Sequence, residues 1–173
     1  QEKSYTVDLT HEYVKNNFQF SSSIYQTEIE NIIDFSTNKF SNLDGGKFKG
    51  VEFFATTQND FENISMGLNL VNIKLSTGKE AARRPNYSFD TSYSKKLNDQ
   101  NEYKITWQWK GRRFDISQKE MKAYDVVDLD YIHDTSKYQV LLSLKNVFDR
   151  EYEVARDYST LGRALQVTAQ YKY

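Results

Sequence analysis

The chain has 173 residues, and its 23 basic and 24 acidic side chains give no reason to expect a nucleic acid as partner. It has no cysteine, which excludes a disulfide framework and thiolate metal sites. Aromatic residues make up 15% of a chain whose mean hydropathy is −0.77, a combination that argues against disorder and favours a wall with one apolar and one wet face.

Period-two alternation runs along the whole chain and predicts nine strands. In the sixth of them, Tyr103, Ile105 and Trp107 alternate with Lys104 and Thr106. In chain order, the predicted strands are marked by residues 5–13, 18–24, 51–55, 64–70, 87–93, 103–109, 127–131, 138–144 and 165–173. Helical spacing is scarce, so the sequence predicts an all-β fold.

The connections between these strands are of two kinds, which alternate along the chain. The short ones are polar and rich in Asn and Asp, the chemistry of tight hairpins; they are 15–17, 58–61, 98–101 and 134–136. The long ones are 34–48, 76–86, 111–124 and 148–162. Short turns at one end and long loops at the other are expected of an outer-membrane β-barrel, although soluble up-and-down barrels also have two kinds of end.

The faces of the strands favour a membrane barrel. Large polar side chains fit a wide, water-filled lumen; they are Lys104, Gln108, Lys110, Asp128, Asp130, Gln139, Lys145 and Lys172. Aromatic residues near strand ends, such as Tyr13, Trp109 and Tyr173, suit interfacial girdles. The chain has no apolar run of about 18 residues, which a transmembrane helix requires. We therefore predict an antiparallel transmembrane β-barrel, with a soluble barrel as the alternative.

The odd number of strands predicts an incomplete barrel. If Tyr173 lies at the short-turn, periplasmic end, the ninth strand runs inward and so does the first. A complete bacterial barrel has an even number of strands, and an unpaired edge is costly in hydrocarbon. Because no leader begins at Gln1, we expect either that a leader has been removed or that the chain begins partway through a larger protein.

Four motifs occur in order along the chain. They are Glu2-Lys3-Ser4, Glu30-Asn31-Ile32-Ile33-Asp34, Gly50-Val51-Glu52, and Lys145-Asn146-Val147-Phe148-Asp149-Arg150-Glu151-Tyr152 followed by Gly162-Arg163. Together they resemble the C-terminal portion of a TonB-dependent outer-membrane receptor, although Gln1 stands where the family usually has proline. Arg83-Arg84-Pro85 and the loop from Tyr158 to Gly162-Arg163 are most similar to the vitamin B12 (cobalamin) receptor subgroup, whose scaffold siderophore receptors largely share.

The resemblance implies that residues 1–173 are about nine C-terminal strands of a 22-stranded barrel. It implies a plug domain and some thirteen further strands outside this chain, and a location in the bacterial outer membrane among lipid and lipopolysaccharide. A small-molecule substrate, cobalamin or a ferric siderophore, would bind from outside and be imported with energy from the TonB complex, which pulls on the plug. Independently of the resemblance, we expect no cofactor and no metal site, because the chain carries no metal-ligand motif.

Four loop residues are candidates for contact with ligand or lipopolysaccharide: Arg83, Arg84, Arg156 and Tyr158. The guanidinium groups offer a fork that matches phosphate. The alternative interpretation is that Arg83 and Arg84 anchor their loop to an acidic neighbour. Arg156 also lies within a mixed-charge segment, 150–157, that is typical of a local surface network.

The last strand is a candidate assembly signal. Leu165, Val167, Ala169, Tyr171 and Tyr173 share one face, and such a strand can add to an exposed strand edge on the barrel-assembly machinery. The alternative is an ordinary lipid-facing strand that ends in an interfacial aromatic residue.

Catalysis has little support in the sequence. His11 falls on the apolar face of its strand and His133 beside a tight turn, and neither belongs to a metal-ligand motif. Asp128 and Asp130 are simpler to explain as lumen charge. We expect no enzyme activity, but a membrane-embedded enzyme, a stand-alone barrel and a client fragment of the assembly machinery remain alternatives to a transporter segment.

Overall fold

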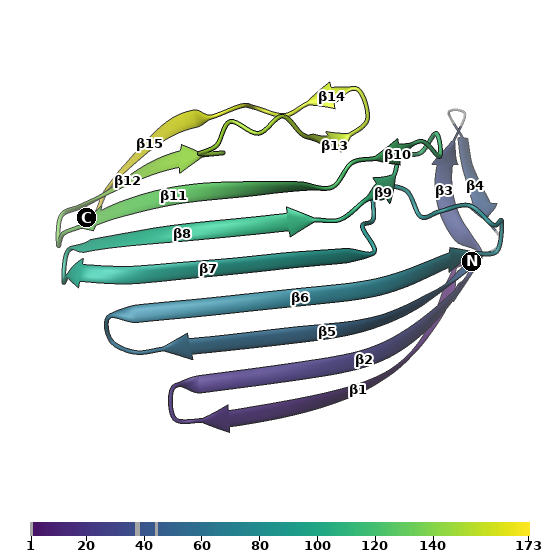
Figure 1. Cartoon of the computed structure of the whole chain (residues 1–173), viewed down its shortest axis with the longest axis horizontal. Coiled ribbons are helices and arrows are strands. Elements are labelled where there is room, and N and C mark those ends of the chain that lie inside the picture. The colour runs from purple at the N-terminus through teal and green to yellow at the C-terminus, as the bar shows by residue number, and fades with distance from the viewer. Residues whose placement is uncertain (1, 37–38, 44) are drawn as a thin grey trace.

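The computed structural model describes residues 2–36, 39–43 and 45–173, and the side chains of residues 2–31 and 45–173. Its main element is a sheet of nine antiparallel strands, each paired with its neighbours along the chain (Figure 1). These strands are β1 (Lys3–Lys15), β2 (Phe18–Glu30), β5 (Gly46–Gln58), β6 (Glu62–Leu75), β7 (Tyr87–Asn98), β8 (Asn101–Lys110), β11 (Tyr124–Asp134), β12 (Tyr138–Lys145) and β15 (Ala164–Tyr171).

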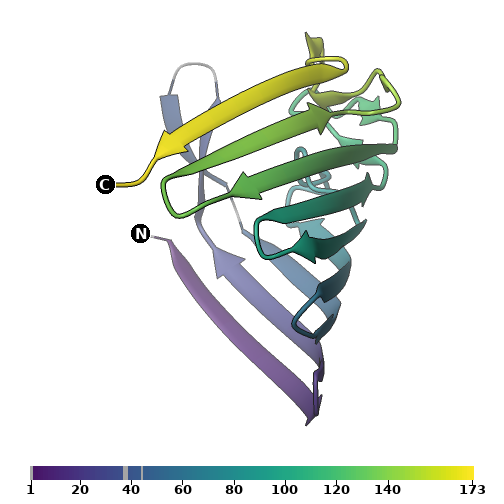
Figure 2. The same cartoon turned by 90° about the vertical axis from the view of Figure 1, so that its left-hand side faces the viewer.

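The predicted all-β, antiparallel fold is confirmed, and eight of the nine predicted segments lie inside one strand each. The ninth was predicted to reach residue 173, but β15 ends at Tyr171 because its partner β12 begins at Tyr138. The sheet curves strongly and stays open, with β1 and β15 as its two edges (Figure 2). No helix in the described part of the chain has the length and apolarity to span a membrane.

The first long connection lies three residues earlier than predicted. β2 ends at Glu30 and β5 begins at Gly46, so the connection is 31–45 rather than 34–48. It carries a hairpin of β3 (Ile32–Ser36) and β4 (Lys39–Leu43). The prediction missed the strand ends because charged residues such as Glu28 and Lys47 interrupt the apolar alternation, while the backbone ladder pairs them regardless of side chain.

Tight turns lie at one end of the sheet and loops at the other (Figure 1). The loops carry two further hairpins, β9 (Arg113–Phe114) with β10 (Glu120–Met121), and β13 (Glu153–Ala155) with β14 (Tyr158–Ser159). The turns use Asn side chains as predicted; for example, Asn59 Oδ1 accepts hydrogen bonds from the main-chain nitrogens of Phe61 and Glu62 at 2.9 and 2.7 Å. The chain enters the sheet at the loop end and leaves it at the turn end.

The register divides the sheet into an apolar face and a polar face. On the apolar face, Leu9, Ile24, Val51, Leu70 and Tyr87 stand opposite one another in a row across five strands. These side chains are unusually open to their surroundings; Leu9 is 74% exposed. An exposed apolar surface of this extent needs a covering medium.

The polar face is a network of hydrogen bonds and ion pairs. Lys110 Nζ bonds Asp90 at 2.8 Å across β8 and β7. Lys145 reaches both Asp128 and Asp130 at 3.3 Å. Hydroxyl pairs also link neighbouring strands; Ser65 and Ser92, 2.7 Å apart, join β6 and β7, and Thr6 and Thr27 join β1 and β2. The pattern fits a water-filled lumen, because these polar groups satisfy one another without forming an apolar core.

Gly50, the first residue of the Gly50-Val51-Glu52 motif, has a packing role on the polar face. Tyr25 stands opposite it on β2, and a Cβ at position 50 would lie 2.3 Å from the Tyr25 ring. The glycine therefore makes room for an aromatic side chain that covers the backbone. The need to accommodate the Tyr25 ring therefore explains the glycine of this motif without any role in ligand binding.

Candidate functional site

Three of the four long connections meet at the loop end of the sheet. They are the β6–β7 loop (76–86), the β8–β11 loop (111–123) and the β12–β15 loop (146–163); we call them the loop platform. The β6–β7 and β8–β11 loops are joined by main-chain contacts. Ala82 forms an isolated bridge with Phe114, and the Arg83 nitrogen donates to the Phe114 carbonyl oxygen at 2.6 Å.

Gln118 and Glu80 add a reciprocal pair of hydrogen bonds between these two loops. Gln118 Oε1 accepts from the Glu80 nitrogen at 2.9 Å, and Gln118 Nε2 donates to the Glu80 carbonyl oxygen at 3.1 Å. The oxygen and the nitrogen of the side-chain amide are both bonded, which fixes its orientation.

Asp115 ties the first two loops to the third. Its carboxylate accepts a hydrogen bond from Arg83 Nε at 2.9 Å, and the residue is 8% exposed. The bond from Arg83 holds the pKa of the Asp115 carboxyl below its usual value, and a hydrogen bond from the Arg156 main chain acts in the same direction. One carboxylate therefore holds groups from all three loops.

Arg113 makes a second connection through the platform and is only 4% exposed. Its Nη1 donates to the Lys122 carbonyl oxygen at 2.9 Å, and its Nη2 donates to the Glu153 carbonyl oxygen. The guanidinium carbon lies 4.8 Å from the centre of the Tyr124 ring, which stacks on Tyr152 with 4.5 Å between centroids. Hydrogen bonds and a cation–π contact thus link β9, β11 and the β12–β15 loop.

A cavity of about 810 Å³ lies between the β8–β11 and β12–β15 loops. Its lining carries both signs of charge; the charged residues are Arg113, Glu120, Lys122, Asp149, Arg150, Glu151, Glu153, Arg156 and Asp157. Tyr124 and Tyr152 add aromatic surface. The chemistry suits a polar organic molecule held by several hydrogen bonds rather than a simple ion of one sign.

The four predicted contact residues fall into different environments. Arg83 is a loop anchor, paired with Asp115 as the alternative interpretation expected. Arg156 lines the cavity. Arg84 and Tyr158 are exposed, Tyr158 by 72%. The structure brings Arg83 and Arg156 to the same carboxylate, and ligand contact by any of the four stays a prediction.

The mixed-charge segment is organised by Asn146, which is 3% exposed. Its side chain donates to the Arg150 carbonyl oxygen and accepts from the Arg150 nitrogen, at 2.9 and 2.8 Å. Arg150 Nε then lies 3.9 Å from Asp125, and Arg156 Nε lies 4.0 Å from Asp157. These contacts agree with the local charge network expected from the sequence. Nothing in the sequence distinguishes buried Arg113 from its exposed neighbour Arg112, so Arg113 was missed.

The predicted assembly residues lie where their alternation indicates. Leu165, Val167, Ala169 and Tyr171 stand on the apolar face, opposite Leu144, Leu142, Val140 and Tyr138 of β12. Tyr173 follows the strand, and its ring centroid is 5.3 Å from that of Tyr171. An assembly role stays a prediction.

The histidines lie apart from the loop platform. His11 is on the apolar face with its ring centroid 6.4 Å from that of Phe20, and His133 Nδ1 lies 2.8 Å from Asn101 Oδ1 beside a tight turn. Within the described residues, no group of three or more His, Cys, Asp or Glu side chains is placed to hold a metal ion.

We compared the chain with known proteins to test whether it belongs to the predicted family. Residues 1–147 match the family model of the TonB dependent receptor-like β-barrel. The chain is 25% identical over 171 residues to the vitamin B12 transporter BtuB of Vibrio cholerae serotype O1, covering 91% of this chain and 28% of that protein. It therefore spans little more than a quarter of the length of that relative.

Solved structures agree on the fold. The FrpB iron transporter from Neisseria meningitidis superposes with a TM-score of 0.82 at 15% identity, over 99% of this chain and 32% of that one. The ferric-catecholate import receptor Fiu from E. coli K12 gives a TM-score of 0.77 at 15% identity, over 97% and 27% of the two chains. The resemblance inferred from the motifs is confirmed: the chain belongs to the TonB-dependent receptor β-barrel family.

Proposed function

We propose that this chain is the C-terminal part of the wall, with its outer loops, of an outer-membrane receptor that imports a scarce nutrient with energy from the TonB complex. The observation that carries the proposal is a two-faced, open antiparallel sheet, with loops at one end, in a member of the TonB-dependent receptor family. The open edges of β1 and β15 support the view that further strands complete the barrel.

A location in the outer membrane is supported by the apolar face. A strand that crosses a bilayer at a tilt needs about 9–11 residues, and β7, β8 and β11 have 12, 10 and 11. At the loop end, Tyr87 stacks on Trp109 with 5.1 Å between centroids. An aromatic pair at that edge of the apolar face suits the membrane interface.

For the substrate, we propose cobalamin or a molecule of similar size and polarity. The support is the similarity to a vitamin B12 transporter, together with the mixed polar and aromatic lining of the platform cavity. Ferric siderophores are the second candidate class, since the similar solved structures include iron and ferric-catecholate receptors. Of the predicted contact residues, Arg84 and Tyr158 are exposed, whereas Arg83 is paired with Asp115 and Arg156 with Asp157.

A role as client of the barrel-assembly machinery is compatible with this proposal. β15 is an edge strand, and its apolar side chains are exposed, Leu165 by 71% and Val167 by 63%. Alternate apolar side chains on a free edge are suited to strand addition.

The test is uptake by the full-length protein in a bacterial host that lacks its own cobalamin receptor, with and without functional TonB. We expect TonB-dependent uptake of radiolabelled cobalamin and protein in the outer-membrane fraction. Arg84→Ala and Tyr158→Ala variants should bind less ligand, while Lys79→Ala in the same platform should not. Uptake of ferric siderophores alone would favour the second substrate class, and TonB-independent behaviour would contradict the proposal.

A further inference from the structure

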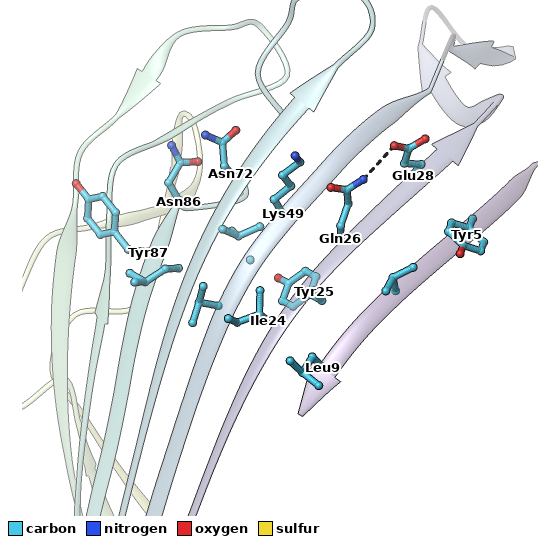
Figure 3. Close-up of a pocket in the computed structure, with 15 residues that line it drawn as sticks. Tyr5, Leu9, Ile24, Tyr25, Gln26, Glu28, Lys49, Asn72, Asn86 and Tyr87 are labelled. Carbon is cyan, nitrogen blue, oxygen red and sulfur yellow. Dashed lines mark hydrogen bonds between the residues drawn. The ribbon is translucent and has the colours of Figure 1, made fainter. Parts of the chain in front are cut away.

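The apolar face of the sheet has a polar boundary at each end of its strands. Towards the loop end, apolar side chains such as Ile24 give way to polar ones such as Gln26 and Asn72, which line a hollow of about 920 Å³ (Figure 3). Towards the turn end, β6 begins with Glu62, which stands opposite Lys95 of β7. Ten positions separate Asn72 from Glu62 on β6, which is roughly 23 Å along the membrane normal at a rise of about 3.3 Å per residue and a tilt of about 45°. The apolar band of an outer-membrane barrel is about 25 Å tall, which would place Glu62 and Lys95 among the headgroups on the turn side.

Glu62 and Lys95 form an ion pair that uses only part of its hydrogen-bonding capacity. Lys95 Nζ lies 2.8 Å from Glu62 Oε1, and the Tyr93 hydroxyl donates to the same oxygen at 3.1 Å. Among the described residues both contacts end on Oε1, so the second carboxylate oxygen, Oε2, is left to accept from another donor. The Lys95 ammonium has three donors, of which this pair uses one. The pair can therefore bind one further donor and one further acceptor.

A second, smaller hollow begins one strand beyond the ion pair. It has a volume of about 380 Å³ and is lined by side chains of β8, β11, β12 and β15, among them Tyr103, Ile105, Leu129 and Leu142; we call it the β8–β15 hollow. These side chains belong to the apolar face, since Leu129 stands opposite Ile105 in the register. The β8–β15 hollow is therefore suited to an apolar chain.

Tyr103 connects the ion pair to the β8–β15 hollow. It lines the hollow, stands opposite Lys95, and has its ring centroid 5.9 Å from that of Tyr93. One row of the register runs from Glu62 through Lys95 and Tyr103 to Leu142. Glu62 is the first residue of β6, whereas Leu142 is the fifth residue of β12. The hollow thus lies further from the turns than the ion pair does, which matches an amphiphile with its headgroup at the turn end.

The charges of the ion pair restrict the kind of headgroup. A carboxylate and an ammonium side by side have no net charge, so they fit a headgroup that itself carries one charge of each sign. A phosphate can accept a charge-assisted hydrogen bond from Lys95, and a primary ammonium can donate one to Glu62. A headgroup with a phosphate alone would bring its negative charge close to Glu62. A quaternary ammonium has no N–H group to donate to Oε2.

We propose that the Glu62–Lys95 pair and the β8–β15 hollow together bind a zwitterionic glycerophospholipid with a primary ammonium group, of the phosphatidylethanolamine type, in the leaflet on the turn side. Its ammonium would donate to Glu62 Oε2, and its phosphate would accept from Lys95. One acyl chain would pass Tyr103 and lie on Leu129 and Leu142. The inference rests on the proposed location in the outer membrane, and it adds a lipid partner at the end of the wall opposite to the loop platform.

The test measures binding of phosphatidylethanolamine to the full-length receptor in detergent, by native mass spectrometry. The variant carries Glu62→Gln and Lys95→Gln. The matched control carries Glu102→Gln and Lys96→Gln, which stand opposite each other on the polar face of the same two-strand region; each double variant removes one charge of each sign. We expect the first variant to bind about tenfold more weakly, because two charge-assisted hydrogen bonds are lost. The control should stay within about twofold of the unmodified receptor.

Two further arms test the headgroup and the acyl chain. Phosphatidylglycerol, which has no ammonium, and phosphatidylcholine, whose ammonium is quaternary, should bind the unmodified receptor as weakly as phosphatidylethanolamine binds the Glu62 and Lys95 variant. Leu142→Trp, which fills the β8–β15 hollow, should weaken phosphatidylethanolamine binding several-fold. Equal binding by the variant and the control, equal binding of the three lipids, or unchanged binding by Leu142→Trp would overturn the proposal. Outer-membrane fractionation and substrate uptake in the same strains separate these outcomes from failure of the proposed function, which would abolish both readouts in the unmodified receptor.

Discussion

Arg83 and Asp115, 32 positions apart in the chain, are joined by Nε and Oδ1 at 2.9 Å, and through them the β6–β7 loop is fixed to the β8–β11 loop. The carboxylate is largely buried, and the Arg156 main chain approaches it from the third loop. The loop platform is therefore held by a charge that depends on pH.

We predict that acid loosens the platform. Because the folded pKa of Asp115 is lowered, its stabilising contribution is complete above the ordinary pKa of an aspartate, about 3.9. It declines as the pH falls through the lowered value. Spin labels at Thr77 and Ser117 should report one distance at pH 7 and a distribution that broadens as the pH is lowered further below the ordinary pKa of an aspartate.

The Asp115→Asn variant should show the broad distribution already at pH 7, and little change on acidification. Asp157→Asn is the matched control, since Asp157 is 84% exposed at its side chain and lies 4.0 Å from Arg156. A narrow distribution for Asp115→Asn at pH 7 would contradict the prediction.

A second prediction concerns Arg113, whose buried guanidinium bonds two carbonyl oxygens and faces Tyr124. Arg113→Ala should lower the local opening free energy of the β8–β11 and β12–β15 loops by about 2–4 kcal/mol, because hydrogen bonds from a charged donor are lost. Hydrogen exchange of segments 111–123 and 150–160 in the full-length receptor measures this.

Arg112→Ala serves as the control in the same experiment. Arg112 is exposed, and its ion pair with Glu120 spans 3.5 Å, so its loss should cost less than about 1 kcal/mol. If both variants exchange alike, Arg113 does not hold the loops together.

A third prediction uses two glycines of the sheet. Gly50→Ala brings a methyl group against the Tyr25 ring, at 2.3 Å unless the ring moves, whereas the nearest atom to a Cβ at Gly67 is 4.0 Å away. Gly50→Ala should destabilise the full-length barrel by about 1–3 kcal/mol, measured by urea unfolding, and Gly67→Ala should not. Adding Tyr25→Ala should remove most of the Gly50→Ala cost, and additive effects would refute the packing explanation.

A fourth prediction separates assembly from stability at the C-terminus. Tyr173 lies beyond β15, so its deletion leaves every pair of that strand in place. If the terminal aromatic residue is part of the assembly signal, its deletion should lower the yield of heat-modifiable receptor in the outer membrane several-fold. The protein that does assemble should have an unchanged free energy of unfolding. Gln170→Ala, on the polar face, should assemble normally; equal yields for both variants would leave Tyr173 as an interfacial residue only.

The parts of the fold that could be predicted are those governed by side-chain alternation. Ile105 and Trp107 repeat at every second position because one face of their strand is apolar, and the nine strands follow from that rule. The loop-side ends of β2 and β5 were not predicted, because Glu28 and Lys47 interrupt the alternation of apolar residues. Their main chains nevertheless pair in the sheet.

The loop platform was less accessible to prediction, because its contacts join residues far apart in the chain. Arg83 stood out beside Pro85, yet its partner Asp115 lies in another loop, and no local pattern indicates the pair. Arg113 is buried by Tyr124 and the β12–β15 loop, an environment created only when the strands bring these segments together.

The unequal lengths of β6 and β7 also shape the loop end of the sheet. β6 runs five residues, 71 to 75, past its last pair with β7 at Leu70 and Tyr87, which is roughly 16 Å along the strand. The outer margin of the wall is therefore stepped. In the receptor that we propose, we therefore expect an incoming molecule to reach the loop platform on the lower side of the wall, beside the projecting end of β6.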